Sequence, residues 1–408
     1  YKYQFGFRQG HSTSHSLINL TEEIRKSLDK GEFVAGTFID LQKAFDTVNH
    51  EILLSKLDFY GIRGLPYQWF KSYLSNRKQY TFVNNCASEI VNTKYGVPQG
   101  SVLGPLLFLI YINDLNKAIC HSKTQHFADD TAFLYANQSL KKINQKTNHD
   151  LSNMVAWIRA NRISINVNKT KIVLFRPHKK TFSKKLNFRI SGQKIIPSDQ
   201  VYYLGITLDK NLSFTTHTHN VRNKLSRANG LLAKIRHHIN KDALKTIYHA
   251  IFCSYMNYAA QIWGLSSKNI SNSIQKLQNK ALRIINFKKY YDECEILFRQ
   301  CKILKFEDTI FYNNCLFVSN CLAKTTPEAF NNTYKLTQDN HTYSTRGSRN
   351  KLIDVPKVNT HYYGTNSFKL TSLRQWNSLQ NTLNFDLTEH HRKKTQFKKN
   401  LKSYLINK

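Results

Sequence analysis

Hydrophobic positions in the first half of the chain switch between helical and strand spacing. A first helix is predicted by apolar residues three or four positions apart, Leu17, Leu20, Ile24 and Leu28. Gly31 ends it, and the unbroken apolar run 33–39 that follows is typical of a strand buried on both faces. The same patterns predict helices over residues 51–60, 66–74, 105–115 and 140–158, and strands over 79–84, 89–95, 163–167 and 172–175. We expect the last two strands to pair with each other.

The second half of the chain has a mainly helical pattern. Residues 201–208 form one predicted strand, in which Gly205 indicates a bulge or a close approach of backbone. From Phe214 onward, the spacing predicts helices over residues 219–238, 242–255, 270–285, 305–322 and 397–405. A polar, basic and turn-rich segment covers residues 334–364.

Two adjacent carboxylates, Asp129 and Asp130, stand between two short alternating runs, residues 123–127 and 131–135. Such runs predict a hairpin with the aspartates at its turn. Neighbouring like charges repel, so the pair needs a lysine, an arginine or a divalent metal nearby, unless it is simply a solvated turn. A metal site built only from carboxylate oxygens suits Mg²⁺ or Mn²⁺. This stretch alone leaves these interpretations open.

The net charge of the chain indicates which kind of partner it is expected to bind. The 408 residues carry a formal charge of +34, and such a field attracts a polyanion, with nucleic acid as the first candidate. The alternative is a protein kept soluble by excess lysine. A dense basic stretch over residues 176–194, with Phe182 and Phe188 interleaved, suits phosphate contact with some base stacking. It is equally typical of an exposed linker.

The cysteines and the hydropathy of the chain indicate in which cellular compartment the protein is expected. Seven cysteines are scattered without a C-x-x-C pair, which predicts free thiols in a reducing, intracellular compartment. The last four lie in helical sequence and are expected to pack in the core: Cys294, Cys301, Cys315 and Cys321. The longest apolar run, residues 102–112, is too short to span a bilayer, so we expect no membrane partner.

Three ordered segments carry most of the remaining chemistry. Residues 38–46 read FIDLQKAFD, residues 96–101 read GVPQGS, and residues 127–130 read FADD. In this order and spacing they resemble the palm of a reverse transcriptase. Residues 3–13, YQFGFRQGHST, resemble the block before the first catalytic aspartate in LINE-type, non-LTR retrotransposons of the jockey kind. Residues 201–205, VYYLG, resemble the primer-grip hairpin of these proteins. A further similarity is to the tail that often follows their thumb, carried by Arg346, Val355-Pro356, Phe368, 373–379 and 397–399.

The resemblance implies an α+β fold: a right-hand polymerase palm, with an antiparallel sheet, helices on one side and partial fingers, then a mostly α-helical thumb and a C-terminal extension. The expected domains are a palm with residual fingers at 1–175, a basic linker and primer-grip-like hairpin at 176–212, a helical thumb at 213–300, and a helical, basic C-terminal extension at 301–408. Because the chain begins at Tyr1 within structured-looking sequence, we expect an N-terminal part with the fingers strands and the endonuclease to be missing.

The same resemblance assigns catalytic roles. Asp40 and Asp129 would bridge two Mg²⁺ ions, or Mn²⁺, with Asp130 close by in a less essential role. The backbone carbonyl of Leu41 would add a ligand. Lys169 would lie near the leaving pyrophosphate as a general acid or an electrostatic partner, although a solvated loop lysine is an equal alternative.

Nucleotide and template contacts are implied as well. Phe45 would lie under the sugar and exclude a 2′-hydroxyl, unless it is only a core residue. Gln99 and Gly100 would line the nascent base pair, and Arg8 would supply one triphosphate contact. The template and primer contacts would come from Gly96, Pro98, Ser101, Leu204 and Gly205. Asp46 is either a fourth carboxylate or, as we expect, a helix-start aspartate.

The predicted function is therefore RNA-directed DNA polymerisation, with dNTPs added to a primer 3′-hydroxyl. The expected partners are an RNA template and a DNA primer or target; protein partners stay open. The expected location is the nucleus, the cytoplasm or both. The alternatives are a catalytically silent nucleic-acid-binding remnant of a retroelement, an RNA-dependent RNA polymerase, which Phe45 argues against, and an unrelated helical RNA-binding protein.

Overall fold

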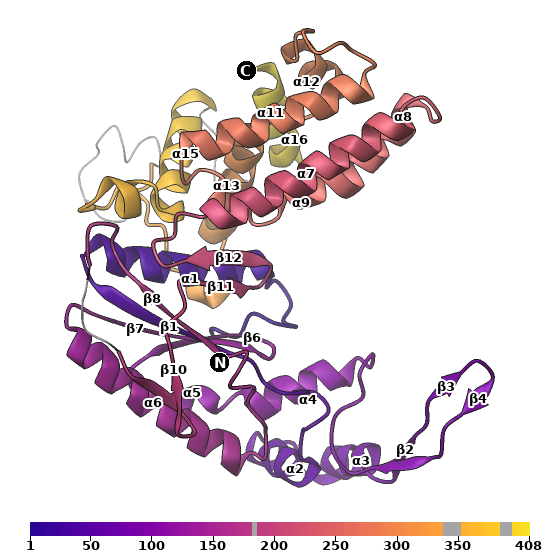
Figure 1. The fold of residues 1–408 in the computed structure, drawn as a ribbon, viewed down its shortest axis with the longest axis vertical. Coiled ribbons are helices and arrows are strands. Elements are labelled where there is room, and N and C mark those ends of the chain that lie inside the picture. Colours follow the sequence, from indigo (N-terminus) through magenta and orange to yellow (C-terminus); the bar gives the residue numbers. More distant parts are fainter. Residues whose placement is uncertain (182–185, 338–351, 384–393) are drawn as a thin grey trace. The chain divides into compact units, whose positions relative to one another are not determined.

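The computed structural model describes residues 1–181, 186–337, 352–383 and 394–408 (Figure 1). Contacts divide the chain into two compact units. Unit 1 contains residues 1–16 and 31–203, and unit 2 contains residues 17–30 and 204–408. Helix α1 (Thr13–Asp29) therefore belongs mostly to unit 2, although it is near the start of the sequence. The four-domain organisation stays a prediction.

Unit 1 is built on a four-stranded antiparallel sheet with the order β6-β7-β1-β8. Its strands are β1 (Phe33–Ile39), β6 (Lys123–Phe127), β7 (Asp130–Asn137) and β8 (Lys171–Phe175). Every residue of β1 is buried, as its unbroken apolar run predicts. Strands β7 and β8 cover its two edges, and complete burial requires that both faces be covered as well; Phe38, for example, packs against the ring of Tyr203.

Helices cover one face of this sheet. Phe33, Ala35 and Ile39 of β1 share a core with apolar residues of three helices, α2 (His50–Phe59), α4 (Leu103–Ile112) and α6 (Leu140–Ala160). Alternate residues of a strand point to opposite faces, so these odd-numbered residues form one face. The mixed α+β class is confirmed.

The remaining elements of unit 1 are short. They are α3 (Gly64–Leu74), β2 (Arg77–Gln79), β3 (Phe82–Val83), β4 (Cys86–Ala87), β5 (Val91–Thr93), α5 (Leu115–Ala118), β9 (Phe188–Ile190), β10 (Gln193–Ile195) and β11 (Gln200–Tyr203). The two strands expected at 79–84 and 89–95 are two separate short ladders, β2 with β5 and β3 with β4.

The strand predicted at 163–167 and its pairing with 172–175 are wrong, and so is the stacking predicted for Phe188. Residues 163–167 form no strand; Ile165 makes a single bridge to Leu41, and β8 pairs with β1 instead. Phe188 in the basic stretch is fully buried in the core beside α6, so it cannot stack on a base. Phe182 of that stretch, with Lys184 and Lys185, lies outside the described residues, as does Arg346.

Unit 2 is mostly helical. After β12 (Ile206–Asp209) it contains α7 (Thr215–Ile235), α8 (Lys241–Ile247), the π-helix η1 (Tyr248–Cys253), α9 (Ser254–Asn257), α10 (Ala260–Trp263), α11 (Lys268–Ile285), α12 (Glu295–Cys301), α13 (Phe306–Leu322), the 3₁₀-helix η2 (Glu328–Phe330), the π-helix η4 (His361–Thr365), α15 (Phe368–Leu383) and α16 (Lys394–Asn407). The helix expected at 242–255 is therefore interrupted by η1. The strand expected at 201–208 is also two strands, β11 and β12.

The core of unit 2 contains Trp263, which is fully buried with its ring centroid 5.6 Å from that of Phe306. Cysteines 294, 301, 315 and 321 are buried free thiols, as predicted. Among the described residues, no helix is both long and apolar enough to cross a membrane.

Polar side chains on α1 bind backbone from the far end of unit 2. The carboxylate of Glu22 accepts hydrogen bonds from the N–H groups of Phe368 (2.8 Å) and Lys369 (3.2 Å), where α15 begins. Asp29 accepts from the N–H groups of Asn359 and Thr360. Carboxylates are favourable at a helix N-terminus, where free N–H groups and the helix dipole attract negative charge.

Candidate active site

The sheet brings three aspartates to one place. In the register of β1 and β7, Ile39 lies opposite Thr131, so the next position places Asp40 beside Asp130. Asp129 precedes Asp130 at the tip of the β6–β7 hairpin, whose last pair is Phe127 with Asp130. Residues 89 positions apart in the sequence therefore meet because β1 lies next to β7.

The hairpin turn differs slightly from the prediction. Its two central residues are Ala128 and Asp129, and Asp130 is already the first residue of β7. Ala128 has φ 56°, in the left-handed region that glycine adopts most easily. An alanine there costs roughly 1–2 kcal/mol, so other contacts must hold the turn.

Burial and neighbouring negative charge raise the pKa of two of the three carboxylates, Asp129 and Asp130. Burial raises the pKa of Asp130 to about 6, and the charges of Asp129 and Asp40 add to the effect. Burial and the charge of Asp40 also raise the pKa of Asp129, while a backbone hydrogen bond opposes the rise. Concentrated negative charge of this kind is relieved by a cation.

A second segment is hydrogen-bonded to the end of β1. Asn166 donates its N–H to the carbonyl of Asp40 (2.8 Å), and Gln42 donates to the carbonyl of Ser164 (2.8 Å). In this antiparallel pattern the carbonyl of Leu41, between the two bonds, points away from residues 164–166. It therefore faces the other side of β1, where the hairpin lies.

The turn at residues 166–170 presents Lys169 as an exposed side chain. Thr170 fixes this turn: its hydroxyl donates to the carbonyl of Asn166 (2.9 Å) and accepts from the N–H of Asp40 (3.4 Å). Our sequence interpretation did not include Thr170 or Asn166. A threonine next to a loop lysine gives no periodic signal, and only the fold shows that it binds Asp40.

The glycine-containing loop at 96–101 is docked on the segment that follows Asp40. The N–H groups of Gly96 and Val97 donate to the carbonyls of Val48 and Phe45, each at 2.8 Å. Gly96 has φ 88°, and a Cβ there would lie 2.8 Å from the carbonyl oxygen of Asp46. Glycine is therefore required for this close approach.

Asp46 and Gln99 bind each other. The side-chain amide of Gln99 donates to Asp46 Oδ1 at 2.8 Å, and both residues are exposed. The expectation that Asp46 starts a helix is wrong, because Asn49 caps α2 by accepting from the N–H of Ile52 (3.0 Å). Asp46 instead orients Gln99 in the loop.

The other predicted loop residues differ in their surroundings. Ser101 donates to the carbonyl of Pro98 (2.8 Å) and accepts from the N–H of Gly104, which fixes the start of α4. Gly100 has φ 80°, with open space around its missing Cβ. Space at this point is what a loop that approaches a ligand requires.

Phe45 is half-buried against other aromatic rings. Its centroid lies 4.6 Å from that of Phe108 and 6.2 Å from that of Phe7. Core packing thus fixes the ring, while part of it stays exposed. Arg8 is exposed as well, and its guanidinium donates to the carbonyls of Tyr1 and Gln4, which leaves further N–H groups for a ligand.

Leu204 and Gly205 begin the part of unit 2 that follows β11, and both have positive φ angles, 43° and 79°. Tyr258 donates its hydroxyl to the carbonyl of Leu204 at 2.7 Å. A Cβ on Gly205 would lie 2.8 Å from the ring of Tyr258. This tyrosine therefore holds the turn that we expect at the primer.

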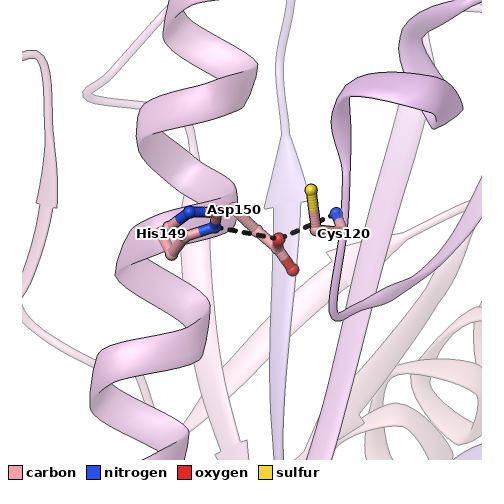
Figure 2. A group of neighbouring side chains, drawn as sticks. All are labelled: Cys120, His149 and Asp150. Carbon is pink, nitrogen blue, oxygen red and sulfur yellow. Dashed lines mark hydrogen bonds and ion pairs between the residues drawn. The ribbon is translucent and has the colours of Figure 1, made fainter.

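Another group of potential metal ligands lies in unit 1 (Figure 2). Atoms of Cys120, His149 and Asp150 lie within 4.8 Å of one another, and this is the only such trio among the described residues. The carboxylate of Asp150 already accepts hydrogen bonds from the N–H groups of residues 120–122 and from the Ser122 hydroxyl (2.6 Å). We therefore assign Asp150 to holding the loop before β6.

The donor atoms of the aspartates near β1 suit Mg²⁺ or Mn²⁺ better, although the three carboxylates do not all lie within 4.8 Å of one another. Asp40, Asp129, Asp130 and the Leu41 carbonyl offer only oxygen atoms, the donors that Mg²⁺ and Mn²⁺ prefer. The raised pKa values of Asp129 and Asp130 reflect burial and neighbouring negative charge, which a bound cation would relieve.

Comparison with known proteins agrees with this geometry. The protein-family model "Reverse transcriptase (RNA-dependent DNA polymerase)" matches residues 2–208, half of the chain. The chain belongs to the reverse transcriptase family. Reverse transcriptases in general use divalent metal ions, in keeping with the carboxylates described above.

Similar reverse transcriptases come from non-LTR retrotransposons, which confirms the predicted relationship. The chain is 33% identical over 332 residues to a probable RNA-directed DNA polymerase from transposon BS of Drosophila melanogaster, covering 76% of this chain and 35% of that protein. It is 31% identical over 323 residues to the RNA-directed DNA polymerase from mobile element jockey of the same species, covering 76% and 34%. The chain thus spans about a third of the length of these relatives.

Solved structures with some likeness include two telomerases. Apo telomerase from Candida tropicalis matches with a TM-score of 0.41 and 13% identity, over 78% of this reverse transcriptase chain and 50% of that one. Telomerase from Candida albicans, in complex with a fragment of telomeric RNA, matches with a TM-score of 0.35 and 12% identity, over 74% and 51%.

Proposed function

We propose that this chain is the palm and thumb of an RNA-directed DNA polymerase. It adds deoxynucleotides to the 3′-hydroxyl of a DNA primer or target, opposite an RNA template. The observation that carries the proposal is the meeting of Asp40, Asp129 and Asp130 at the end of β1, with raised pKa values at two of them. Family membership supports the same reaction class.

In this proposal, Asp40 and Asp129 would hold two Mg²⁺ ions, for which Mn²⁺ can substitute, with help from Asp130 and the Leu41 carbonyl. Such ions, when bound, would lower the pKa of the attacking hydroxyl and stabilise charge on the phosphoryl oxygens. The new bond joins the primer 3′-oxygen to the α-phosphorus, the hydroxyl proton passes to solvent water, and the bond between the α-phosphorus and the pyrophosphate oxygen breaks. Lys169, in the turn at residues 166–170 that is hydrogen-bonded to Asp40, neutralises or protonates the leaving pyrophosphate.

The substrate contacts follow from the packing of the loop residues. Phe45, held by Phe108, excludes a 2′-hydroxyl and so selects dNTPs. Gln99, oriented by Asp46, and Gly100 line the nascent base pair, and Arg8 contacts the triphosphate. The contacts to the template and primer come from Gly96, Pro98, Ser101, Leu204 and Gly205.

A catalytically silent nucleic-acid-binding protein is the second candidate. The net charge of +34 supports binding whether or not the chain catalyses, and the chain covers about a third of its relatives. An RNA-dependent RNA polymerase is less well supported, because the aromatic ring of Phe45 leaves no polar group for a ribose hydroxyl. For either DNA polymerase or silent binder, we propose a nuclear or cytoplasmic location with the element's RNA.

Primer extension on an RNA template with dNTPs and Mg²⁺ tests the proposal. The decisive variant is Asp129→Asn, which keeps the shape of the side chain and removes its charge. The matched control is Asp58→Asn, because the Asp58 side chain is exposed and pairs with the exposed Arg63. Extension by the wild type and the control, lost in Asp129→Asn, is the expected result. Salt-sensitive RNA binding without extension would support the silent binder.

A further inference from the structure

The N-terminal segment forms a support beside the aspartate hairpin. Phe5 donates its N–H to the carbonyl of His126 (2.8 Å), and His126 donates to the carbonyl of Tyr3 (3.0 Å). This parallel bridge places Gln4 next to the end of β6. Both segments belong to unit 1, and the bridge extends the sheet beyond β6 at the level of the turn.

The side chain of Gln4 reaches the turn itself. It is 5% exposed, and its Oε1 accepts hydrogen bonds from the N–H groups of Ala128 (3.0 Å) and Gly6 (2.9 Å). In a two-residue hairpin, the N–H of the first turn residue points out of the ladder and has no partner on the opposite strand. Gln4 therefore satisfies a donor that the hairpin leaves free.

Gly6 lets this support come close. A Cβ at Gly6 would lie 2.3 Å from the backbone nitrogen of Ala128 and 3.0 Å from the carbonyl carbon of Phe127. Real Cβ atoms do not make such contacts, so only glycine fits here. The backbone of residue 6 thus packs directly on the strained turn, whose Ala128 has φ 56°.

We propose that Gln4 is a positioning residue, whose side-chain oxygen fixes the orientation of the Ala128–Asp129 turn and so the presentation of Asp129 and Asp130 to metal. The inference rests on the proposed metal-binding function of these aspartates. Gln4 touches neither metal nor substrate. A neutral amide suits this position, because it accepts two hydrogen bonds without adding charge beside three carboxylates.

Two substitutions at Gln4 separate the hydrogen bond from the packing. Gln4→Met keeps the length and most of the volume but removes the acceptor, so two buried N–H groups lose their partner. Gln4→Glu keeps an acceptor for both N–H groups and adds a negative charge. The matched control is Gln145→Met, because Gln145 is exposed on α6.

The measurement is Mn²⁺ affinity of the whole chain at neutral pH, by electron paramagnetic resonance of the free ion, with steady-state extension kinetics alongside. We expect Gln4→Met to weaken Mn²⁺ binding about tenfold and to lower kcat with little change in the KM for dNTP. Gln4→Glu should bind Mn²⁺ at least as tightly as the wild type, and the control should be unchanged. Opposite effects of the two variants are not expected from a purely structural role.

The outcomes distinguish the role of Gln4 from the metal site on which that role depends. Wild-type affinity in Gln4→Met, or equal loss in Gln4→Met and Gln4→Glu, overturns the role of Gln4 alone, provided that Asp129→Asn still abolishes binding. Mn²⁺ binding that persists in Asp129→Asn overturns the proposed metal site, and the inference about Gln4 with it. If Gln4→Met does not fold, the Gln4→Glu result still decides, because a loss of binding there contradicts the proposal.

Discussion

Protons and divalent metal should compete for the aspartate site at mildly acidic pH. Burial and two neighbouring carboxylates raise the pKa of Asp130 to about 6, whereas an isolated aspartate titrates near 3.8. Metal ligation requires the deprotonated carboxylate, so the apparent affinity falls once the pH drops below this pKa. The perturbation is therefore a change of pH from 7.5 to 5.

The size of the effect follows from the pKa. A ligand with a pKa of about 6 raises the apparent Kd by about elevenfold at pH 5 and by about twofold at pH 6, relative to pH 7.5. An aspartate with an ordinary pKa would change the Kd by less than about 10% over the same range. Asp129, whose pKa is also raised, adds to the effect.

Mn²⁺ titrations at several pH values, read by electron paramagnetic resonance, measure this dependence. Asp40→Asn is an informative variant, because it removes a charge that raises both pKa values. We expect it to bind Mn²⁺ more weakly at pH 7.5 but to lose less affinity on acidification. The exposed Asp58→Asn variant should keep the wild-type profile.

The stability of the metal-free protein should also depend on pH, and the contribution of Asp130 should decrease as the pH rises. The folded-state pKa of Asp130 lies above its unfolded value, so its contribution to stability is fully present below about pH 3.8 and is lost as the pH rises through about 6. Added Mn²⁺ should therefore raise the melting temperature more at pH 7 than at pH 5. A Kd that does not change between pH 5 and 7.5 would refute the reasoning about this site.

Three further predictions concern single residues. In urea unfolding, Gly96→Ala should lower the free energy of unfolding more than Gly100→Ala. A Cβ at residue 100 would meet open space, so Gly100→Ala carries only the cost of the left-handed backbone, about 1–2 kcal/mol. Equal losses in the two variants would contradict the close packing of Gly96. Phe45→Val should raise ribonucleotide incorporation by about 10–100-fold in single-nucleotide extension, and unchanged discrimination would argue against the sugar contact. Asp150→Asn should lower stability by about 1–3 kcal/mol, and Zn²⁺ should not raise the melting temperature of the wild type; a zinc-dependent rise would instead support a metal site.

Elements with an unambiguous local pattern could be predicted from the sequence. The strand at 33–39 is confirmed residue for residue, because complete burial requires an unbroken apolar run. The hairpin predicted from the runs 123–127 and 131–135 is confirmed as well, with its second strand extended to Asp130–Asn137, since its strands pair across a two-residue turn and no distant segment is needed to define it. The position of Asp40 followed from the first of these elements.

Which strands pair with each other could not be predicted in the same way. Residues 163–167 alternate and residues 172–175 form a short apolar run, yet β8 pairs with β1, about 135 residues earlier in the chain. Alternation indicates a strand but does not specify the strand beside it. Phe188 shows a similar limit, because a basic neighbourhood suggested exposure whereas its strand buries every second residue.

The supports of the site were also hidden in the sequence. Gln4 and Thr170 act through one hydrogen bond each to the backbone of the aspartate segments, and neither belongs to a periodic pattern. One signal was available for Gln4: Gly6 follows two residues later, and a glycine can mark a close approach of backbone. Its partner, however, lies 124 residues away.

The hydrogen bonds from α1 to residues 359–369 have a consequence for synthesis of the protein. Glu22 leaves the ribosome 346 residues before the Phe368 N–H group that it binds. Until then, the buried apolar residues of α1, among them Leu20, Ile24 and Leu28, lack part of the unit that covers them. Contacts between segments so far apart form slowly and late. Unit 2 therefore completes its folding only after residues 359–369 have been made, and nascent chains should depend on chaperones that shield α1.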